Sequence, residues 1–219
     1  GAYTALATDS NALLYNPAGL GRITSREATF MHNQHFESIT QEYFGFADSR
    51  GLGVSLNYLN FGSVPKTTIS NPGGIGLGSA VMSDMAVGAG YGRAINKDLS
   101  VGAGVKLIRE SIDGISVNAF AVDLGALYYV PSVPKLTLGL AVQNLGSSVK
   151  FQSASERLPL NLRAGTAYGF TLLGRKTTAA IDVMKEKSEG ALFGFGLEVL
   201  AANTAPVRLG YNTRNAAGS

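Results

Sequence analysis

The sequence contains no cysteine and no tryptophan, and only 15% of its 219 residues are charged. The absence of cysteine excludes disulfides and thiol chemistry within this chain. The charged fraction lies below the roughly 25% of typical soluble domains. Lysine and arginine are scattered, so the net charge of +3 forms no basic cluster, and we expect no nucleic-acid partner.

Long apolar runs are also missing. No stretch approaches the roughly 20 apolar residues that a membrane-spanning helix needs. The first ten residues, GAYTALATDS, lack the basic start and apolar core of a signal peptide, as expected of a chain that begins at a processed or trimmed end. A closed β-barrel is the other structure that can span a bilayer, and none of these absences excludes it.

Apolar and small residues alternate with period two over most of the chain after residue 26, which predicts strands. Most of the predicted strands reach ten residues, whereas strands of globular proteins average about five or six. Tilted strands of about nine to eleven residues are the length that a bilayer requires. The eleven predicted strands span residues 27–36, 39–48, 51–61, 81–95, 99–111, 116–130, 135–146, 161–173, 176–186, 190–201 and 205–213.

The two faces of these strands differ in residue size. In LGLAVQNLG, residues 138–146, Leu138, Leu140 and Val142 share one face, whereas Gln143 shares the other with glycine and alanine. Bulky apolar residues outside and small residues with an occasional polar group inside are typical of a transmembrane barrel with a narrow or plugged interior. The expected fold is therefore all-β, an antiparallel up-and-down transmembrane barrel over residues 23–219. The alternative is a soluble sandwich or barrel with an apolar core.

The predicted connections also alternate in length. Short ones follow every second strand, whereas the longest, residues 62–80 and 147–160, follow the third and seventh strands. The connections SIDGIS and KEKSEG are intermediate, and the one after the first strand is short and does not fit the alternation. Short turns at one end and longer loops at the other are typical of outer-membrane barrels.

Residues 1–22 form a separate predicted segment, a plug that contains a short helix. Asp9 or Ser10 is expected to cap this helix, and the Asn-Pro step at residue 17 is expected to end it. Gly19 and Gly21 would then let the chain turn sharply. The helix is too apolar to be left in water, so we expect it to pack inside the barrel. The candidate plug and gate residues are Leu13, Leu14, Tyr15, Asn16, Pro17 and Gly19.

Seven polar residues fall on the small-residue face of the predicted strands. Opposite signs fall on several neighbouring strands, and buried charges must be paired or hydrated, so ion pairs along the inner wall are expected. One interpretation is a structural network that braces the barrel and its plug, and the other is a polar constriction that selects what passes. The residues are Lys106, Asp123, Gln143, Arg163, Asp182, Glu198 and Arg208.

No other motif predicts a chemical site. His32 and His35 are three apart, which places them on opposite faces of a strand, and no third ligand is evident, so no metal is expected. The glycine-rich stretch at 71–78 lacks the lysine and the following helix of a phosphate-binding loop. No Ser-His-Asp order or carboxylate pair stands out, so we expect neither an enzyme nor a cofactor.

Several stretches together resemble one family. AYTALATDSNALLYNPAGL, FMHNQHFESITQEYFGFA, VGAGVKLIRESIDG, AVDLGALYYVP, LGLAVQNLGSSVKF and RLPLNLRAGTAYGF are similar to the PorV/PorQ-like family of FadL-type bacterial outer-membrane barrels. The resemblance implies fourteen strands, with the N-terminal segment inside as a plug at residues 5–20. The last residues, RNAAGS, depart from the pattern, and about three strands are expected to be missing.

The resemblance leaves two functions open. The first is passage of hydrophobic or amphipathic small molecules across the outer membrane, with membrane lipid around the barrel and a hydrophobic ligand or detergent in its lumen. The second is a scaffold or shuttle in a type IX-type secretion system, which would bind cargo or other outer-membrane proteins through the loops at 62–80 and 147–160.

Overall fold

A computed structural model describes residues 1–34, 39–151, 154–187, 190–201 and 205–213. Eleven strands form one antiparallel sheet, and their order along the sheet is their order along the sequence. Two further strands, between β7 and β10 in the sequence, form a separate hairpin. The strands are β1 (Glu27–Gln34), β2 (Thr40–Ala47), β3 (Leu52–Pro65), β4 (Ser79–Ala94), β5 (Leu99–Ile112), β6 (Ile115–Tyr129), β7 (Leu136–Gly146), β8 (Ser148–Phe151), β9 (Ala154–Arg157), β10 (Asn161–Leu172), β11 (Arg175–Glu186), β12 (Ala191–Ala201) and β13 (Ala205–Asn212).

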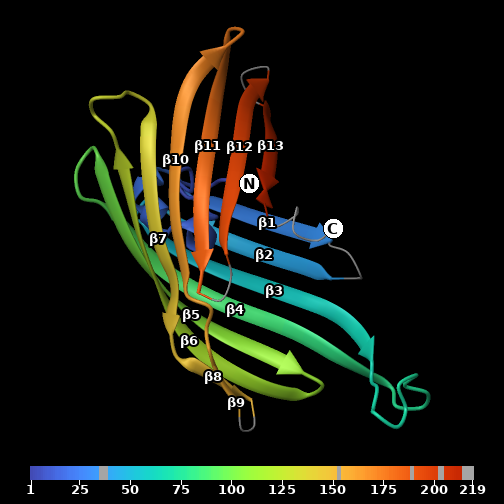
Figure 1. Ribbon diagram of the computed structural model, residues 1–219. Helices are drawn as coiled ribbons and strands as arrows, with labels where there is room; N and C mark the ends of the chain where they lie inside the picture. The colour runs from blue at the N-terminus through green and yellow to red at the C-terminus, as the bar shows by residue number, and fades with distance from the viewer. Residues whose placement is uncertain (35–38, 152–153, 188–189, 202–204, 214–219) are drawn as a thin grey trace.

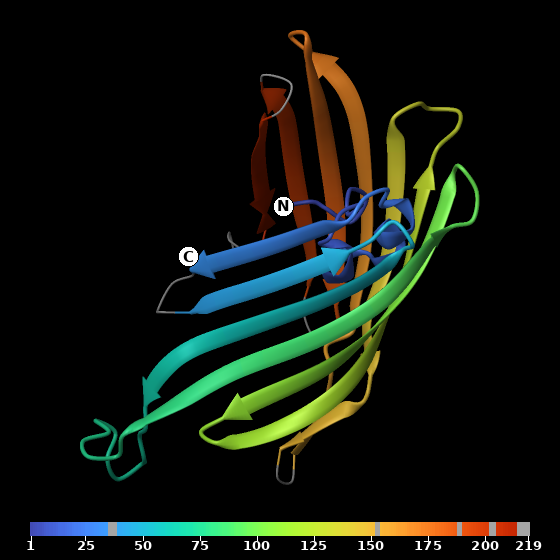
Figure 2. The same ribbon diagram turned by 180° about the vertical axis from the view of Figure 1, so that it is seen from behind.

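The sheet curls around the N-terminal segment, residues 1–22, which lies inside the curve (Figures 1 and 2). Each strand from β2 to β12 in this sheet pairs with two neighbours, whereas the described residues of β1 and β13 pair with one neighbour each. The all-β, antiparallel, up-and-down fold predicted from the sequence is confirmed. No helix in the described ranges is both long enough and apolar enough to cross a bilayer.

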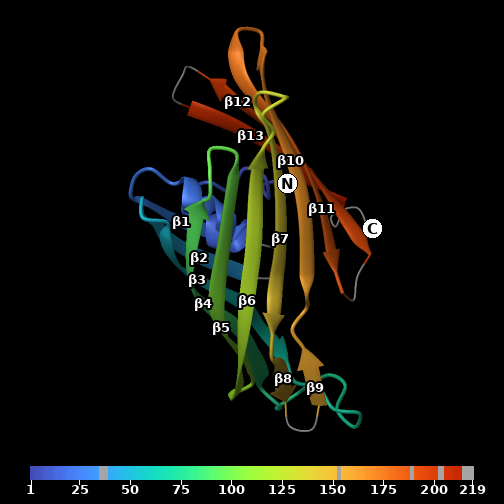
Figure 3. The ribbon, with the colours of Figure 1, turned by 90° about the vertical axis from the view of Figure 1, so that its left-hand side faces the viewer.

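The connections differ from the sequence-based expectation in two places. SIDGIS is not a loop of intermediate length, because β5 and β6 extend to a two-residue turn at Asp113 and Gly114. Both residues have positive φ, 51° and 83°, which is the conformation that Asp-Gly favours in a tight hairpin. Residues 147–160 include the β8–β9 hairpin, which continues beyond the ends of β7 and β10 (Figure 3).

The convex and concave faces of the sheet carry different side chains. Leu140 on the convex face is 61% exposed, whereas the next residue, Ala141 on the concave face, is 3% exposed. Large exposed apolar residues occupy the convex side of every strand in the sheet from β1 to β13. Charged side chains on that face lie toward strand ends, such as the His32–Glu42 pair (Nδ1–Oε1 2.5 Å) between β1 and β2. His35 lies outside the described residues.

The N-terminal segment forms two short helical turns. The α-helix α1 covers Ala12–Tyr15, and the 3-10 helix η1 covers Pro17–Arg22. Asn11, not Asp9 or Ser10, occupies the N-cap position of α1, and its side chain makes no capping bond. Asp9 instead accepts hydrogen bonds from the Asn11 N–H (2.9 Å) and from the Tyr3 hydroxyl, so it forms a turn ahead of the helix.

Glycines on the concave face let this segment lie directly on the sheet. A β-carbon at Gly139 would lie 2.6 Å from the Thr4 carbonyl oxygen, and one at Gly102 would overlap the Pro17 carbonyl. Gly21 serves the same purpose from within the segment, whereas Gly19 lets the segment pack on itself, because a β-carbon there would overlap the Ala7 carbonyl; neither makes the expected sharp turn. Both are helical, and a β-carbon at Gly21 would lie 2.5 Å from Ser100 Oγ. The small side chains of the concave face therefore let the N-terminal segment lie in direct contact with the sheet.

Candidate functional site on the concave face

The N-terminal segment crosses the concave face from β13 to β3 and β4. Gly1 lies beside Gly210 of β13, Thr4 lies over Gly139 and Gly165, and Leu13 reaches Gly53 and Gly90. At its far end, the Arg22 guanidinium donates to the carbonyl oxygens of Lys97 (3.0 Å) and Asn96 (3.2 Å) in the β4–β5 turn. Polar contacts hold the segment along most of this path.

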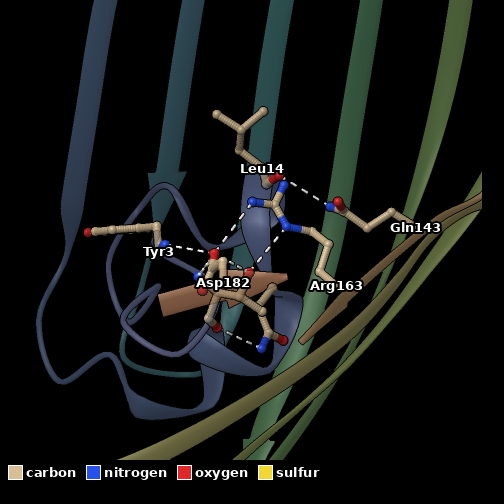
Figure 4. A network of polar contacts seen from close by, with 7 residues as sticks. Tyr3, Leu14, Gln143, Arg163 and Asp182 are labelled. Atoms are coloured by element: carbon tan, nitrogen blue, oxygen red, sulfur yellow. Dashed lines mark hydrogen bonds and ion pairs between the residues drawn. The ribbon is translucent and has the colours of Figure 1, made fainter. Parts of the chain in front are cut away.

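Asp182 of β11 holds the start of the segment (Figure 4). Its Oδ2 accepts hydrogen bonds from the backbone N–H groups of Tyr3 (2.8 Å) and Thr4 (2.9 Å) and from the Thr4 hydroxyl (2.7 Å). The Asp182 side chain is fully buried, and its carboxylate rests on Gly165, where a β-carbon would collide with Oδ1. One carboxylate oxygen thus satisfies three donors that would otherwise be buried without a partner.

Arg163 of β10 completes this network. Its guanidinium lies 3.7 Å from Asp182 Oδ2, and its Nε donates to the Thr4 hydroxyl (3.1 Å). The guanidinium also lies over the ring of Tyr15, 5.2 Å from the centroid, and Tyr15 meets Tyr3 edge-on at 5.0 Å. The Arg163 side chain is only 10% exposed. A carboxylate, a hydroxyl and an aromatic face around the guanidinium offset the free-energy cost of removing its charge from water.

Asn16 joins the two halves of the segment to β6. Its fully buried amide donates to the carbonyl oxygens of Thr4 (3.0 Å) and Ala126 (3.1 Å) and accepts from the Ala18 N–H (3.1 Å). The last bond caps η1, which begins at Pro17. The Asn-Pro pair therefore ends one helix, starts the next and attaches both to the sheet.

Lys106, Asp123 and Gln143 form a second group on β5, β6 and β7. Lys106 Nζ lies 2.9 Å from Asp123 Oδ2 and donates to Asn144 Oδ1 (2.6 Å), while Asn144 N–H donates to Asp123 Oδ1 (2.8 Å). A bulge sets two residues, 143 and 144, opposite Asp123, with Asn144 at φ 63°. Gln143 Nε2 donates to the carbonyl oxygen of Leu14 (3.2 Å) and thereby connects this group to α1.

Glu198 and Arg208 form a third pair, on β12 and β13, with 2.6 Å between Oε2 and Nε. Their side chains are 35% and 62% exposed. They line a cavity of about 190 Å³ together with Tyr3 and Tyr15 of the N-terminal segment. Burial, together with the hydrogen bond to Asp9, raises the pKa of the Tyr3 hydroxyl above its ordinary value, and burial likewise raises the pKa of Tyr15. Both phenols are therefore neutral at physiological pH.

The candidate plug and gate residues all lie in the segment on the concave face. Leu13, Asn16, Pro17 and Gly19 are buried, whereas Leu14 and Tyr15 are half-buried. Leu13 packs with Leu20, Ile23 and Ala47 in a small apolar cluster. The seven inward polar residues divide into the three groups described above rather than forming one network.

Sequence reasoning missed Thr4 and Asn144. Thr4 is separated from Asp182 by 178 positions, and no local pattern links the two residues. The adjacent polar residues Gln143 and Asn144 interrupt the alternation of β7 and were the one available signal of the bulge.

No family model matches the sequence. Two UPF0164 proteins of Treponema pallidum (strain Nichols) are each 29% identical to this chain, over 167 and 177 residues. The alignments cover 71% and 68% of this chain but only 42% and 50% of those proteins. The chain thus spans half or less of the length of the curated relatives it matches.

Solved structures with a similar fold include two channels. The CymD monoaromatic hydrocarbon channel matches with a TM-score of 0.61 and 11% identity, over 95% of this chain and 80% of that one. The Pseudomonas putida toluene transporter TodX matches with a TM-score of 0.60 and 13% identity, over 96% and 82%. Both are FadL-type outer-membrane channels, so the FadL-type fold that the sequence resemblance implied is confirmed. The PorV/PorQ assignment is not confirmed and stays a prediction.

Proposed function

We propose that this chain belongs to an outer-membrane barrel through which small hydrophobic or amphipathic molecules pass, and that residues 1–22 form the plug that controls passage. The observation that carries the proposal is the N-terminal segment, which lies on the concave face and is tied there by Asp182, Asn16 and Gln143. These contacts join the segment to the sheet and are separate from the hydrogen bonds that pair the strands, so we infer that the segment can leave the concave face without unfolding the sheet.

Membrane lipid is the proposed partner of the convex face. Exposed leucine, valine and phenylalanine cover this face, and in water such an extended apolar surface would drive aggregation. The turns at residues 130–135 and 173–174 lie at one end of the sheet, and the 66–78 connection and β8–β9 hairpin lie at the other (Figure 1). This asymmetry is typical of outer-membrane barrels. The FadL-type fold of the two structural neighbours supports the same location.

The secretion-scaffold hypothesis has no comparable support. The described contacts and the comparisons contain no observation that favours binding of cargo or of another outer-membrane protein. It therefore stays a prediction from the sequence resemblance alone.

Single-channel recording of the full-length protein in planar bilayers tests the plug. A variant without residues 1–20 should conduct more than the intact protein, because the segment no longer occupies the concave face. Heat-modifiable mobility on gels shows whether the variant is folded. A folded variant that conducts no better than the intact protein would exclude the plug as the gate.

A further inference from the structure

A second cavity on the concave face lies beside α1, in contact with none of the groups that hold residues 1–4. Its volume is about 230 Å³. Leu13 and Leu14 of the N-terminal segment form one wall, and Leu59 of β3 and Ile108 of β5 contribute further apolar surface. The cavity therefore offers an apolar enclosure whose wall includes the movable part of the proposed plug.

Lys106 is the only basic side chain among the residues that line this cavity. It already has two partners, because its ammonium contacts Asp123 Oδ2 (2.9 Å) and Asn144 Oδ1 (2.6 Å), and the Asp123 side chain is 3% exposed. Its positive charge is thus already neutralised on the wall. An anionic ligand group at Lys106 would have to compete with the buried Asp123 carboxylate for the same ammonium, which is unfavourable.

Asp84 of β4 contributes the opposite charge to the cavity. It lies on the inward side of the strand, half-buried, between Leu59 of β3 and Glu110 of β5 in the register. Within the described ranges, no hydrogen-bond donor or cation contacts the Asp84 carboxylate. The strand neighbour Glu110 adds no positive charge to this part of the wall. A half-buried carboxylate without a partner favours a cation next to it.

We propose that this cavity binds the ammonium group of a small amphipathic amine, with the charge at Asp84 and the apolar part against Leu13, Leu14 and Ile108. A cavity of about 150 Å³ is large enough to hold a benzene ring. The 230 Å³ here therefore has room for one ring and a short amine-bearing chain. Asn57, whose side-chain oxygen accepts from Gln41 Nε2 (2.9 Å), adds a polar group to the same wall.

The inference rests on the proposed function for one point only, the access of a ligand to the concave face. A bound amine would contact the leucines of α1 and would thereby couple occupancy of the cavity to the position of the segment. The proposed site thus specifies the charge of the ligand, which the fold alone does not specify.

Three probes with the same ring and different charge test the proposal by equilibrium dialysis against the full-length protein in detergent. They are 2-phenylethylamine, which is protonated at pH 7, 2-phenylethanol, which is neutral, and 3-phenylpropionate, which is an anion. We expect the amine to bind about tenfold more tightly than the alcohol, a difference of about 1.4 kcal/mol, and the anion to bind most weakly. Asp84→Asn should bring the amine to the affinity of the alcohol.

Asp113→Asn is the matched control, since it removes an acidic side chain in the exposed β5–β6 turn, where Asp113 pairs with Lys66 (2.7 Å). It should leave all three affinities unchanged. Equal binding of the amine and the alcohol by the intact protein would overturn the proposal, as would undiminished amine binding by a folded Asp84→Asn variant. Amine binding without increased conductance on deletion of residues 1–20 would refute the plug and leave this site standing. Increased conductance on deletion without amine binding by the intact protein would refute this site and leave the plug standing.

Discussion

Two ion pairs of the sheet have the same chemistry in different surroundings. Arg163 and Asp182 join β10 to β11 beneath residues 3 and 4, and their side chains are 10% and 0% exposed. Arg208 and Glu198 join β12 to β13 and are 62% and 35% exposed. Asp182 accepts three hydrogen bonds from the N-terminal segment, whereas Glu198 accepts none from it within the described ranges.

The two pairs differ because the N-terminal segment covers one of them. Burial by the segment, rather than the pairing of charges, is therefore what makes Asp182 contribute more to stability than Glu198. An exposed pair contributes between about 0 and 1 kcal/mol, because water screens it and ordering two side chains costs entropy. A buried pair whose partner is removed leaves an uncompensated charge in a poorly hydrated site. Ion pairs occur at several places on the inner wall, but of these two carboxylates only Asp182 is fully buried and accepts hydrogen bonds from the segment within the described ranges.

The largest expected effect follows from Asp182→Ala. The substitution strands the Arg163 guanidinium and leaves the N–H groups of Tyr3 and Thr4 without their acceptor, so the free energy of unfolding should fall by about 3–5 kcal/mol. Glu198→Ala, the matched variant in the exposed pair, should cost less than about 1 kcal/mol. Urea unfolding in lipid vesicles, followed by heat-modifiable mobility, measures both. Equal losses would show that the segment does not shield Asp182.

A second effect concerns the convex face, where the proposal places lipid rather than protein against the side chains. Leu140→Arg should reduce the free energy of unfolding in lipid vesicles by about 2–4 kcal/mol, because Leu140 lies mid-strand on that face. Leu172→Arg, at the end of β10, should cost only about 0–1 kcal/mol. If both variants are as stable as the unaltered protein in vesicles, the convex face does not contact the hydrocarbon of the bilayer.

The smallest effect concerns an ion pair outside the strands. The hydrogen bond from the Arg50 guanidinium (Nε–Oδ2 2.7 Å) lowers the pKa of Asp48 in the β2–β3 turn. Because the folded-state pKa is depressed, this stabilisation is present above the unfolded value of about 3.9 and is lost as pH falls through the lower folded value. Asp48→Asn should therefore be slightly less stable than the unaltered protein at pH 7, and the difference should shrink as pH falls below the unfolded value. A stability difference that does not shrink with falling pH would show that the charge of Asp48 is not its cause.

The strand pattern could be predicted from the sequence because it is local. Each of the eleven strands in the sheet was predicted to within two residues at its start and within four at its end. Period-two alternation needs no knowledge of distant residues, and the same parity placed Lys106, Asp123 and Arg163 on one face. The β8–β9 hairpin was missed because its strands have four residues each, too short for the alternation to be recognised.

The contacts of the candidate site could not be predicted in the same way. Thr4 meets Asp182 across nearly the whole chain, and the acceptor of Gln143, the carbonyl oxygen of Leu14, is 129 positions away. Side-chain preference also misled the helix start, because the Asp9 carboxylate bonds to Tyr3 and Asn11 instead of capping α1. Such contacts depend on where the N-terminal segment lies on the sheet. The glycines of the concave face leave room for the segment but do not determine its position.

Single-channel conductance of Asp182→Asn, compared with that of Glu198→Gln, is the sharpest test of whether the buried network holds a segment that controls passage. Both substitutions remove one negative charge from the inner wall and keep the shape of the side chain, so a change in wall charge alone would affect them similarly. We expect frequent openings of larger conductance for a folded Asp182→Asn variant and records like those of the unaltered protein for Glu198→Gln. Indistinguishable records from the two folded variants would show that the buried network does not hold the segment closed.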